Sequence, residues 1–298
     1  MTGPVASGLR AAPGWRETRR RVTDRAFRAA LLLAFLAAVT PLLLVLGYTV
    51  YRGASHLSAA FLTHSMAGVP PSSAGGGIYH AIVGTVEMVL LSSLISVPVG
   101  LLAALYLTEF GRGWLPRSIR FFVDVMTGIP SIVAGLFVYA FLVLGLHRGY
   151  SGFAGALALA VLQLPVVIRA SEDMLNLVPD ALREASYALG IPQWRTVLSV
   201  VLPTSAAGLT TGVMLAVARV TGETAPLLLT SFDNTFINNN PFSGPQSALS
   251  VFIYNSAQQA YAPAVDRAWA AALTLIVLVI ALYAGARILA RRSALRQR

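Results

Sequence analysis

Six long apolar stretches recur along the chain, and they constrain its fold more than any other feature. A segment that crosses the hydrocarbon core of a bilayer needs about 20 apolar residues, and only a helix or a closed barrel satisfies its own backbone hydrogen bonds there. The stretches cover 28–51, 79–107, 119–146, 152–175, 200–230 and 267–289. The sequence therefore predicts an all-α membrane protein with six transmembrane helices.

The composition also indicates that most of the chain lies in a lipid bilayer. Of the 298 residues, 56% are hydrophobic and only 11% are charged, whereas soluble domains carry about 25% charged residues. Prolines interrupt most of the apolar stretches, and the third and fifth stretches exceed one bilayer thickness. We therefore expect tilted and kinked helices, with kinks at Pro41, Pro98, Pro130, Pro165 and Pro203.

The arginines lie mostly on one side of the predicted membrane. All 22 basic residues are arginine: 18 border the stretches on the side of both termini, three lie on the other side, and Arg219 lies inside the fifth stretch. Because cytoplasmic connections carry an excess of basic residues, both termini are expected in the cytoplasm. We interpret the net charge of +10 as membrane orientation and lipid contact, not as nucleic-acid binding.

The chain lacks the residues or spacings that several kinds of chemistry require. The chain has no cysteine, and it has no lysine for the phosphate loop that binds ATP in many ATPases. Its four histidines are scattered through polar connections without metal-ligand spacing. No nucleophile, base and orienting group recur at a usable spacing. We therefore expect no metal site, no cofactor in this chain and no enzymatic activity of its own.

The connection between the fourth and fifth stretches predicts a helix-turn-helix elbow on the cytoplasmic side. Asp180 is placed to cap a short helix over 181–189, and Gly190 and Pro192 supply the chemistry that ends it. A second short helix is expected from about Gln193 and leads back to the membrane.

The spacing within this elbow resembles the E-A-A-x3-G-x9-I-x-L-P signature of the permeases of ABC importers. The matching residues are Glu184, Ala185, Ser186, Gly190, Val200, Leu202 and Pro203, where Ser186 replaces the second alanine and Val200 the isoleucine. The resemblance implies the six-span fold of type I importer permeases. It also implies that the elbow is the coupling helix, which docks on a separate ATPase subunit that binds the ATP and Mg.

This resemblance assigns roles to five residues of the elbow. Small side chains at Ala185 and Ser186 would allow close packing against the ATPase. Arg183 and Glu184 would pair with charges on it, and Gly190 would permit the sharp turn.

Three further stretches resemble the PstA family of phosphate-transport permeases: "GGGIYHAIVGTVEMVL" (75–90), "RFFVDVMTGIPSIVAGLFVY" (120–139) and "LAVARVTGETAPLLLT" (215–230). The resemblance implies a bacterial inner-membrane permease for inorganic phosphate. Its implied partners are a PstC-like sister permease, a dimer of PstB-like ATPases and a PstS-like external phosphate-binding protein. The PstC family shares several of these features. A permease for another oxyanion (sulfate, molybdate or phosphonate) is the alternative within the class, and a channel or secondary transporter without an ATPase is the alternative outside it.

The resemblance to this family covers about 75–290 and divides the chain into four parts. They are a basic tail expected to be poorly ordered (1–27), a first helix with an external loop (28–74), the permease core (75–290) and a second basic tail (291–298).

Two opposite charges, Arg219 and Glu223, lie inside the fifth stretch. An arginine at the centre of a membrane helix costs about 2.5–3.5 kcal/mol, so it should face the protein interior and have a partner. At positions i and i+4 of one helix the two side chains could pair and hold helices together. Alternatively, Arg219 lines the translocation path and binds phosphate oxygens in a fork, with Thr221 as a hydroxyl donor beside it. Glu223 would then restrain Arg219 in the empty path and accept a hydrogen bond from protonated phosphate, which ionised sulfate cannot donate.

Three other polar residues are candidates for the path or its gates: Arg169, Asp124 and Glu87. Arg169 resembles a family arginine implicated in transport, and a snorkelling arginine at the interface is the alternative interpretation. For Asp124 and Glu87 the alternative is pairing with a neighbouring helix.

Overall fold

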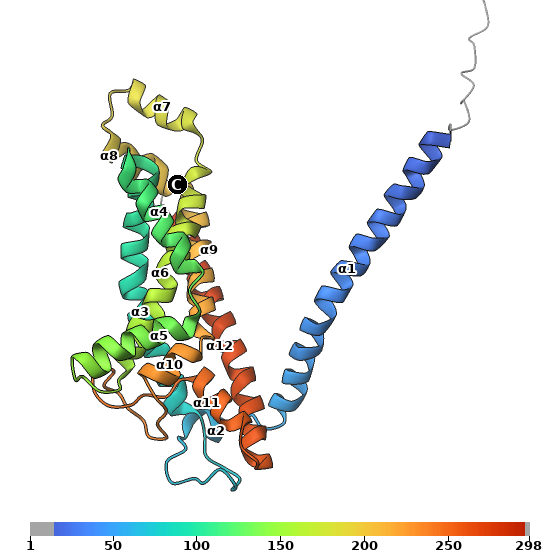
Figure 1. Ribbon diagram of the computed structural model, residues 1–298, viewed down its shortest axis with the longest axis vertical. Helices are drawn as coiled ribbons and strands as arrows, with labels where there is room; N and C mark the ends of the chain where they lie inside the picture. The colour runs from blue at the N-terminus through green and yellow to red at the C-terminus, as the bar shows by residue number, and fades with distance from the viewer. Residues whose placement is uncertain (1–14, 296–298) are drawn as a thin grey trace, which may run out of the picture. The chain divides into compact units, whose positions relative to one another are not determined.

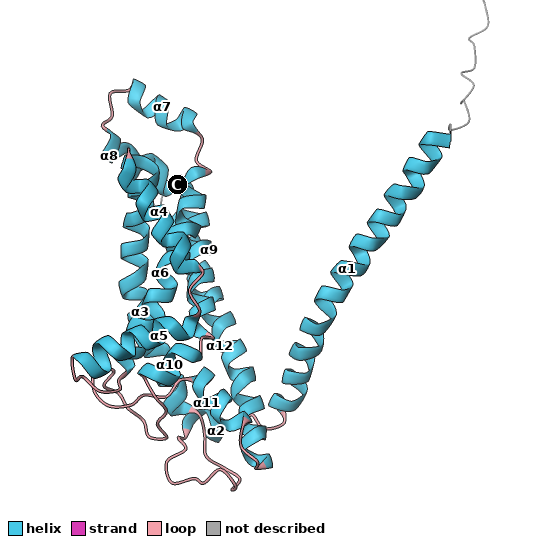
Figure 2. Cartoon of the chain, viewed as in Figure 1, coloured by secondary structure: helices cyan, strands magenta, loops and turns pink. Residues whose placement is uncertain are grey.

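The computed structural model describes residues 15–295, and every regular element within that range is helical (Figures 1 and 2). The elements are α1 (Trp15–Ala54), α2 (Ala59–Thr63), α3 (Tyr79–Leu105), η1 (Tyr106–Phe110), α4 (Trp114–Thr127), α5 (Ser131–Val138), η2 (Tyr139–Gly145), α6 (Gly152–Asn176), α7 (Asp180–Ala188), α8 (Gln193–Thr196), η3 (Val197–Val201), α9 (Leu202–Thr221), α10 (Ala225–Thr230), α11 (Leu249–Ala257) and α12 (Ala262–Leu295). The segments η1, η2 and η3 are π-helical. The all-α prediction is confirmed for this part of the chain.

The chain forms two compact units, Met1–Tyr51 and Arg52–Arg298. The first unit contains most of α1, which begins at Trp15. Residues 15–27, which were expected to belong to a poorly ordered tail, are helical in this structure, and residues 1–14 lie outside the described part. From Trp15 to Thr40 the sequence has no glycine or proline and is rich in alanine, leucine and arginine, which are strong helix formers. The helix accordingly starts well before the apolar stretch does.

Five helices of the described chain are long and apolar enough to cross a membrane, and the count is six if α4 and the α5–η2 segment together make one span. These two pieces meet at an angle of 103°, so the kink expected at Pro130 is a break between two helices. Gly128 ends α4, and Pro130 precedes α5 in an extended conformation (φ −57°, ψ 136°). A proline disfavours the helical conformation of the residue before it, which explains why the chain breaks here.

The fifth apolar stretch is also broken. Helix α9 ends at Thr221, and α10 starts at Ala225, with Pro226 in its first turn. The short helices that follow the two breaks, α5 and α10, pack against each other (Figure 1). A Cβ atom added to Gly135 of α5 would lie 2.5 Å from the Cα of Pro226, so the contact requires a glycine.

The centre of the second unit is the packing of α3 against α6, with α9 beside them (Figure 1). A Cβ atom added to Gly100 of α3 would lie 2.6 Å from Val167 of α6, so the two backbones approach closely. Gln163 of α6 is fully buried; it accepts a hydrogen bond from Ser92 and donates one to Ser93, both at 3.1 Å. Small residues and hydrogen bonds between helices are the usual means of association in lipid, where no hydrophobic effect joins helices.

Candidate functional site

Helices α7 and α8 form an elbow at one end of the second unit, as the sequence predicts (Figure 1). Gly190 has φ +74°, a left-handed conformation that favours glycine, and Pro192 precedes α8. The predicted cap differs in detail. Pro179 is the N-cap, and Asp180 is the first residue of α7. At that position its negative charge still interacts favourably with the positive end of the helix dipole.

The elbow exposes only some of the residues that the family resemblance assigns to docking. Glu184, Ala185 and Gly190 are exposed. Ser186 is buried, and its hydroxyl forms a 2.8 Å hydrogen bond with the Thr196 hydroxyl, so it joins α7 to α8. Ser186, which was expected to allow close packing against the ATPase, packs within the elbow in this structure. The outward face also carries apolar side chains that the sequence reasoning missed, namely Leu182, Tyr187 and Leu189.

Arg183 points toward the bundle and not outward. Its guanidinium forms ion pairs with Glu109 at 2.8 Å and with Asp180 at 3.0 Å. The hydrogen bond with Glu109 is the main reason that the pKa of Arg183 is raised, so the guanidinium stays charged. Arg183, which was expected to pair with a charge on a partner subunit, has its carboxylate partners within the chain in this structure. The sequence reasoning missed Glu109, whose partner is 74 positions away.

Four charged side chains gather between α4 and α6, and we call them the four-charge cluster: Arg120, Asp124, Arg169 and Glu172. Glu172 binds Arg120 at 2.6 Å and Arg169 at 3.1 Å, and Arg169 also pairs with Asp124. The Glu172 side chain is 6% exposed, while those of the two arginines are 38% and 34% exposed.

The four-charge cluster brings together two residues predicted separately, Arg169 and Asp124. Both take part in pairing between helices, which was the alternative interpretation for Asp124, and Arg169 has partners that a snorkelling arginine would lack. The sequence reasoning missed Arg120 and Glu172. The signal was available, since Arg120 lies four positions before Asp124 and Arg169 three before Glu172, on helices expected to be apolar.

Arg219 and Glu223 do not form the predicted pair along one helix. Helix α9 ends at Thr221, and among the described residues no ion pair joins the two side chains. Arg219 is exposed at the last turn of α9. Glu223 lies in the break, where its carbonyl accepts a 2.8 Å hydrogen bond from Ser250. Thr221 is buried and its hydroxyl bonds to the carbonyl of Val217 at 2.7 Å, so in this conformation it is not a donor to a path.

Glu87 belongs to the opposite end of the bundle from the elbow, where long loops gather (Figure 1). The side-chain amide of Gln246 donates to the Glu87 carboxylate and to the carbonyl of Asn238 at 3.2 Å. Gln246 is 1% exposed, so this contact is an interior one that holds the loop between α10 and α11 against α3.

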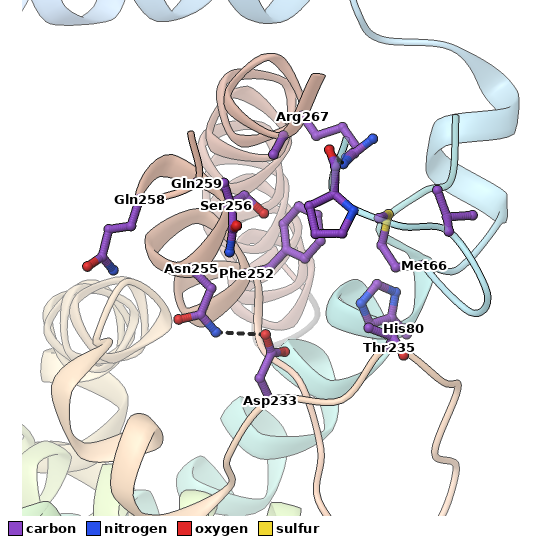
Figure 3. A pocket seen from close by; sticks show the side chains of 13 residues that line it. Met66, His80, Asp233, Thr235, Phe252, Asn255, Ser256, Gln258, Gln259 and Arg267 are labelled. Atoms are coloured by element: carbon purple, nitrogen blue, oxygen red, sulfur yellow. Dashed lines mark hydrogen bonds between the residues drawn. The ribbon is translucent and has the colours of Figure 1, made fainter. Parts of the chain in front are cut away.

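A cavity of about 510 Å³ lies at this loop-bearing end (Figure 3). Its lining includes Met66, His80, Asp233, Phe252, Asn255 and Arg267. The Asp233 carboxylate accepts hydrogen bonds from Ser247 and Asn255, both at 2.7 Å, and from the backbone of Asn234 at 2.9 Å. His80 is 3% exposed and packs edge-on against Phe252, and neither of its ring nitrogens has a hydrogen-bond partner among residues 15–295. The cavity is thus lined by the carboxylate of Asp233, which accepts three hydrogen bonds, and by the buried imidazole of His80, which forms none with the described residues.

We expect replacement of His80 by methionine to stabilise the protein. A buried polar group without a partner costs about 1–3 kcal/mol, and an apolar side chain of similar size removes that cost. The thermal unfolding midpoint of His80→Met in detergent should rise by a few degrees. His64→Met changes an exposed histidine and serves as the control, with no shift expected. A His80→Met midpoint at or below the parental value would contradict the unpartnered state.

Comparison with known proteins gives concordant matches. The sequence profile of the family "Binding-protein-dependent transport system inner membrane component" matches residues 96–295. A phosphate transport system permease protein PstA 1 of Mycobacterium tuberculosis (strain CDC 1551 / Oshkosh) is 42% identical over 262 residues, which cover 88% of this chain and 86% of the relative. A phosphate transport system permease protein PstA of Yersinia pestis is 41% identical over 276 residues, covering 92% and 91%.

Two solved structures share the fold. An inward-facing structure of the MetNI methionine ABC transporter has a chain that aligns with a TM-score of 0.56 and 20% identity, covering 72% of this chain and 94% of that one. A bacterial ABC transporter involved in import of the acidic polysaccharide alginate aligns with a TM-score of 0.59 and 17% identity, covering 91% and 99%. At these identities the likeness extends to the fold alone.

Proposed function

The chain belongs to the family of inner-membrane components of binding-protein-dependent transport systems, and from this premise we propose that it is the permease subunit of an ATP-driven importer of inorganic phosphate. The observation that carries the substrate is the identity of 41–42% to phosphate-system permeases over most of both chains. The chain would form half of the translocation path, and a PstC-like sister permease would form the other half.

A separate PstB-like ATPase dimer would supply the energy, and ATP and Mg would bind there and not to this chain. The elbow supports this assignment because Glu184, Ala185 and the apolar side chains of Leu182 and Leu189 are exposed on its outer surface. With the elbow in the cytoplasm, both termini would lie there too, in a bacterial plasma membrane. The loop-bearing end would then face outward, where a PstS-like protein delivers phosphate.

Arg219 is the residue that we assign to the phosphate path. It is exposed at the last turn of α9, beside the break that separates α9 from α10. A guanidinium binds phosphate oxygens in a fork and stays charged at any relevant pH. Without an ion pair to Glu223 in this conformation, the guanidinium is available to an anion. Glu223 would act on the anion, as the acceptor for a protonated phosphate oxygen.

Transport by the reconstituted complex tests the proposal. Liposomes that contain the chain, its sister permease, the ATPase and the binding protein should take up labelled phosphate when ATP is supplied, and labelled sulfate should not enter. Preferential uptake of sulfate, molybdate or phosphonate would assign the complex to another oxyanion. Uptake by the lone chain without an ATPase would overturn the importer assignment.

Changes on the outer face of the elbow should release the ATPase. Residues central to an interface often contribute about 2 kcal/mol to binding, so Glu184→Arg and Gly190→Val should each reduce the ATPase recovered with the chain about 30-fold. Val at position 190 would also strain the left-handed turn. Asp180→Asn, on the same helix, is the control and should retain the ATPase. Equal recovery with all three variants would place the docking surface elsewhere.

A further inference from the structure

Arg183 is the main polar attachment of helix α7 to the rest of the bundle. Its Nη2 donates to the Glu109 carboxylate at 2.8 Å and to the Leu175 carbonyl at 3.1 Å, and its Nη1 donates to the Val178 carbonyl at 2.6 Å. Its Nε also reaches Glu109, at 3.2 Å. The side chains of Arg183 and Glu109 are only 15% and 4% exposed. The forked contact therefore fixes the orientation of α7 relative to Glu109.

Glu109 is attached to both arms of the elbow. It lies on η1, the π-helical continuation of α3, and its carboxylate holds Arg183 of α7. Its main-chain carbonyl accepts a hydrogen bond from the side chain of Gln193, the first residue of α8. The turn at Gly190 lies between these two attachments, so a displacement of either arm acts on the same residue at the end of α3.

The same π-helical segment is attached to the four-charge cluster. Arg120 of α4 donates to the carbonyl of Leu107 at 2.9 Å and pairs with Glu172 of α6. Leu107 lies two positions before Glu109 on η1. Polar contacts from α7 and from α4 therefore both end on η1, on residues two positions apart, and those from α4 continue to α6. The far end of this chain of contacts is Asp124, in the last turn of α4 before the 103° break.

Stabilisation alone does not explain an ion pair in this place. A buried pair often contributes no more to stability than well-packed apolar residues of the same volume, because both charges lose their hydration. The pair also fixes the orientation of α7 relative to η1, because a planar guanidinium binds a carboxylate in a fixed geometry. Consecutive residues of α7 thus have different tasks: Glu184 is exposed on the outer face, and Arg183 is bound to the interior.

We propose that Glu109 is a positioning residue of the transport cycle, through which movement of the elbow is transmitted by Arg183 to the end of α3. The proposal rests on the function proposed above, because it requires an ATPase that moves α7. When the ATPase moves the elbow, η1 follows, and α3 and the four-charge cluster shift with it. Without the ion pair the elbow still docks, but its movement is no longer passed to the spans.

The test measures ATP hydrolysis and substrate uptake in the same liposomes with the full complex. Because the ion pair links the elbow to η1, Glu109→Gln and Arg183→Gln should each lower the uptake per ATP hydrolysed about tenfold, equivalent to about 1.4 kcal/mol of coupling, while hydrolysis itself stays within about twofold. Arg183→Lys keeps the charge but loses the fork, and should fall between these variants and the parent. Asp180→Asn removes the exposed partner of Arg183 and is the matched control, with a parental ratio expected.

Each outcome decides for or against the link. A parental ratio of uptake to hydrolysis in Glu109→Gln would overturn it, and so would equal loss of uptake and hydrolysis, because that pattern indicates a role in folding or docking only. The parental complex is measured first, with phosphate and with sulfate. If it transports another anion, the proposed substrate fails, and the same ratio measured with that anion still tests the link.

Discussion

Arg219→Ala should reduce phosphate uptake by the reconstituted complex at least about 30-fold, equivalent to about 2 kcal/mol, while the complex assembles normally. Loss of one charged hydrogen-bonding partner of a desolvated anion costs this much or more. Because Arg219 is exposed and forms no ion pair in the described part of the chain, its removal leaves no other charge unpaired. The effect should therefore appear in transport and not in the thermal unfolding midpoint.

Two further variants sharpen this expectation. Arg219→Lys keeps the charge without the fork and should retain an intermediate rate. Arg148→Ala removes an exposed arginine from the loop after η2 and should transport at the parental rate. If Arg219→Ala complexes that assemble normally import phosphate as fast as the parent, Arg219 does not meet the anion.

Glu172→Gln should lower the free energy of unfolding by about 2 kcal/mol. Removing one member of a buried ion pair costs about 3–5 kcal/mol, and the cost is smaller here because Arg120 and Arg169 each keep about a third of their surface in solvent. The amide leaves two arginines beside each other with Asp124 as their remaining carboxylate. The measurement is the thermal unfolding midpoint in detergent.

Asp173→Asn provides the matched control for Glu172→Gln. Asp173 is the next residue along α6, but it is exposed. Its neutralisation should leave the midpoint unchanged. Equal midpoints for Glu172→Gln and the parent would show that the four-charge cluster does not hold α4 against α6.

The parts of the fold that the sequence predicted are those set by local chemistry. The length of each apolar stretch predicted a membrane helix, and the spacing of Asp180, Gly190 and Pro192 predicted the elbow. A kink was expected at Pro130, but its angle was not, because a proline in an apolar run predicts a kink without its angle, and the break after Thr221 was missed. That angle depends on tertiary contacts such as Gly135 against Pro226, which join segments far apart in the chain.

The candidate site was predicted less completely, because pairing is a property of three-dimensional neighbours. Arg169 and Asp124 were both selected as unusual charges, but their common partner Glu172 was not. Arg183 was assigned to a partner subunit because its carboxylate, Glu109, lies 74 positions earlier on another span. The pairing of Arg219 with Glu223 assumed a continuous helix, and the end of α9 at Thr221 removed that premise.

The polar contact between α3 and α6 has a consequence for biosynthesis. Ser92 is made 71 residues before Gln163, an interval of about 4–14 s at ordinary rates of translation. During that interval the Ser92 hydroxyl can be satisfied by the carbonyl of Val89 in its own helix, at 3.0 Å. The side-chain amide of Gln163 instead forms its hydrogen bonds with Ser92 and Ser93 of α3, and it is made when both serines are already in place. The order of the two residue types along the chain therefore spares the nascent protein an unsatisfied amide in lipid.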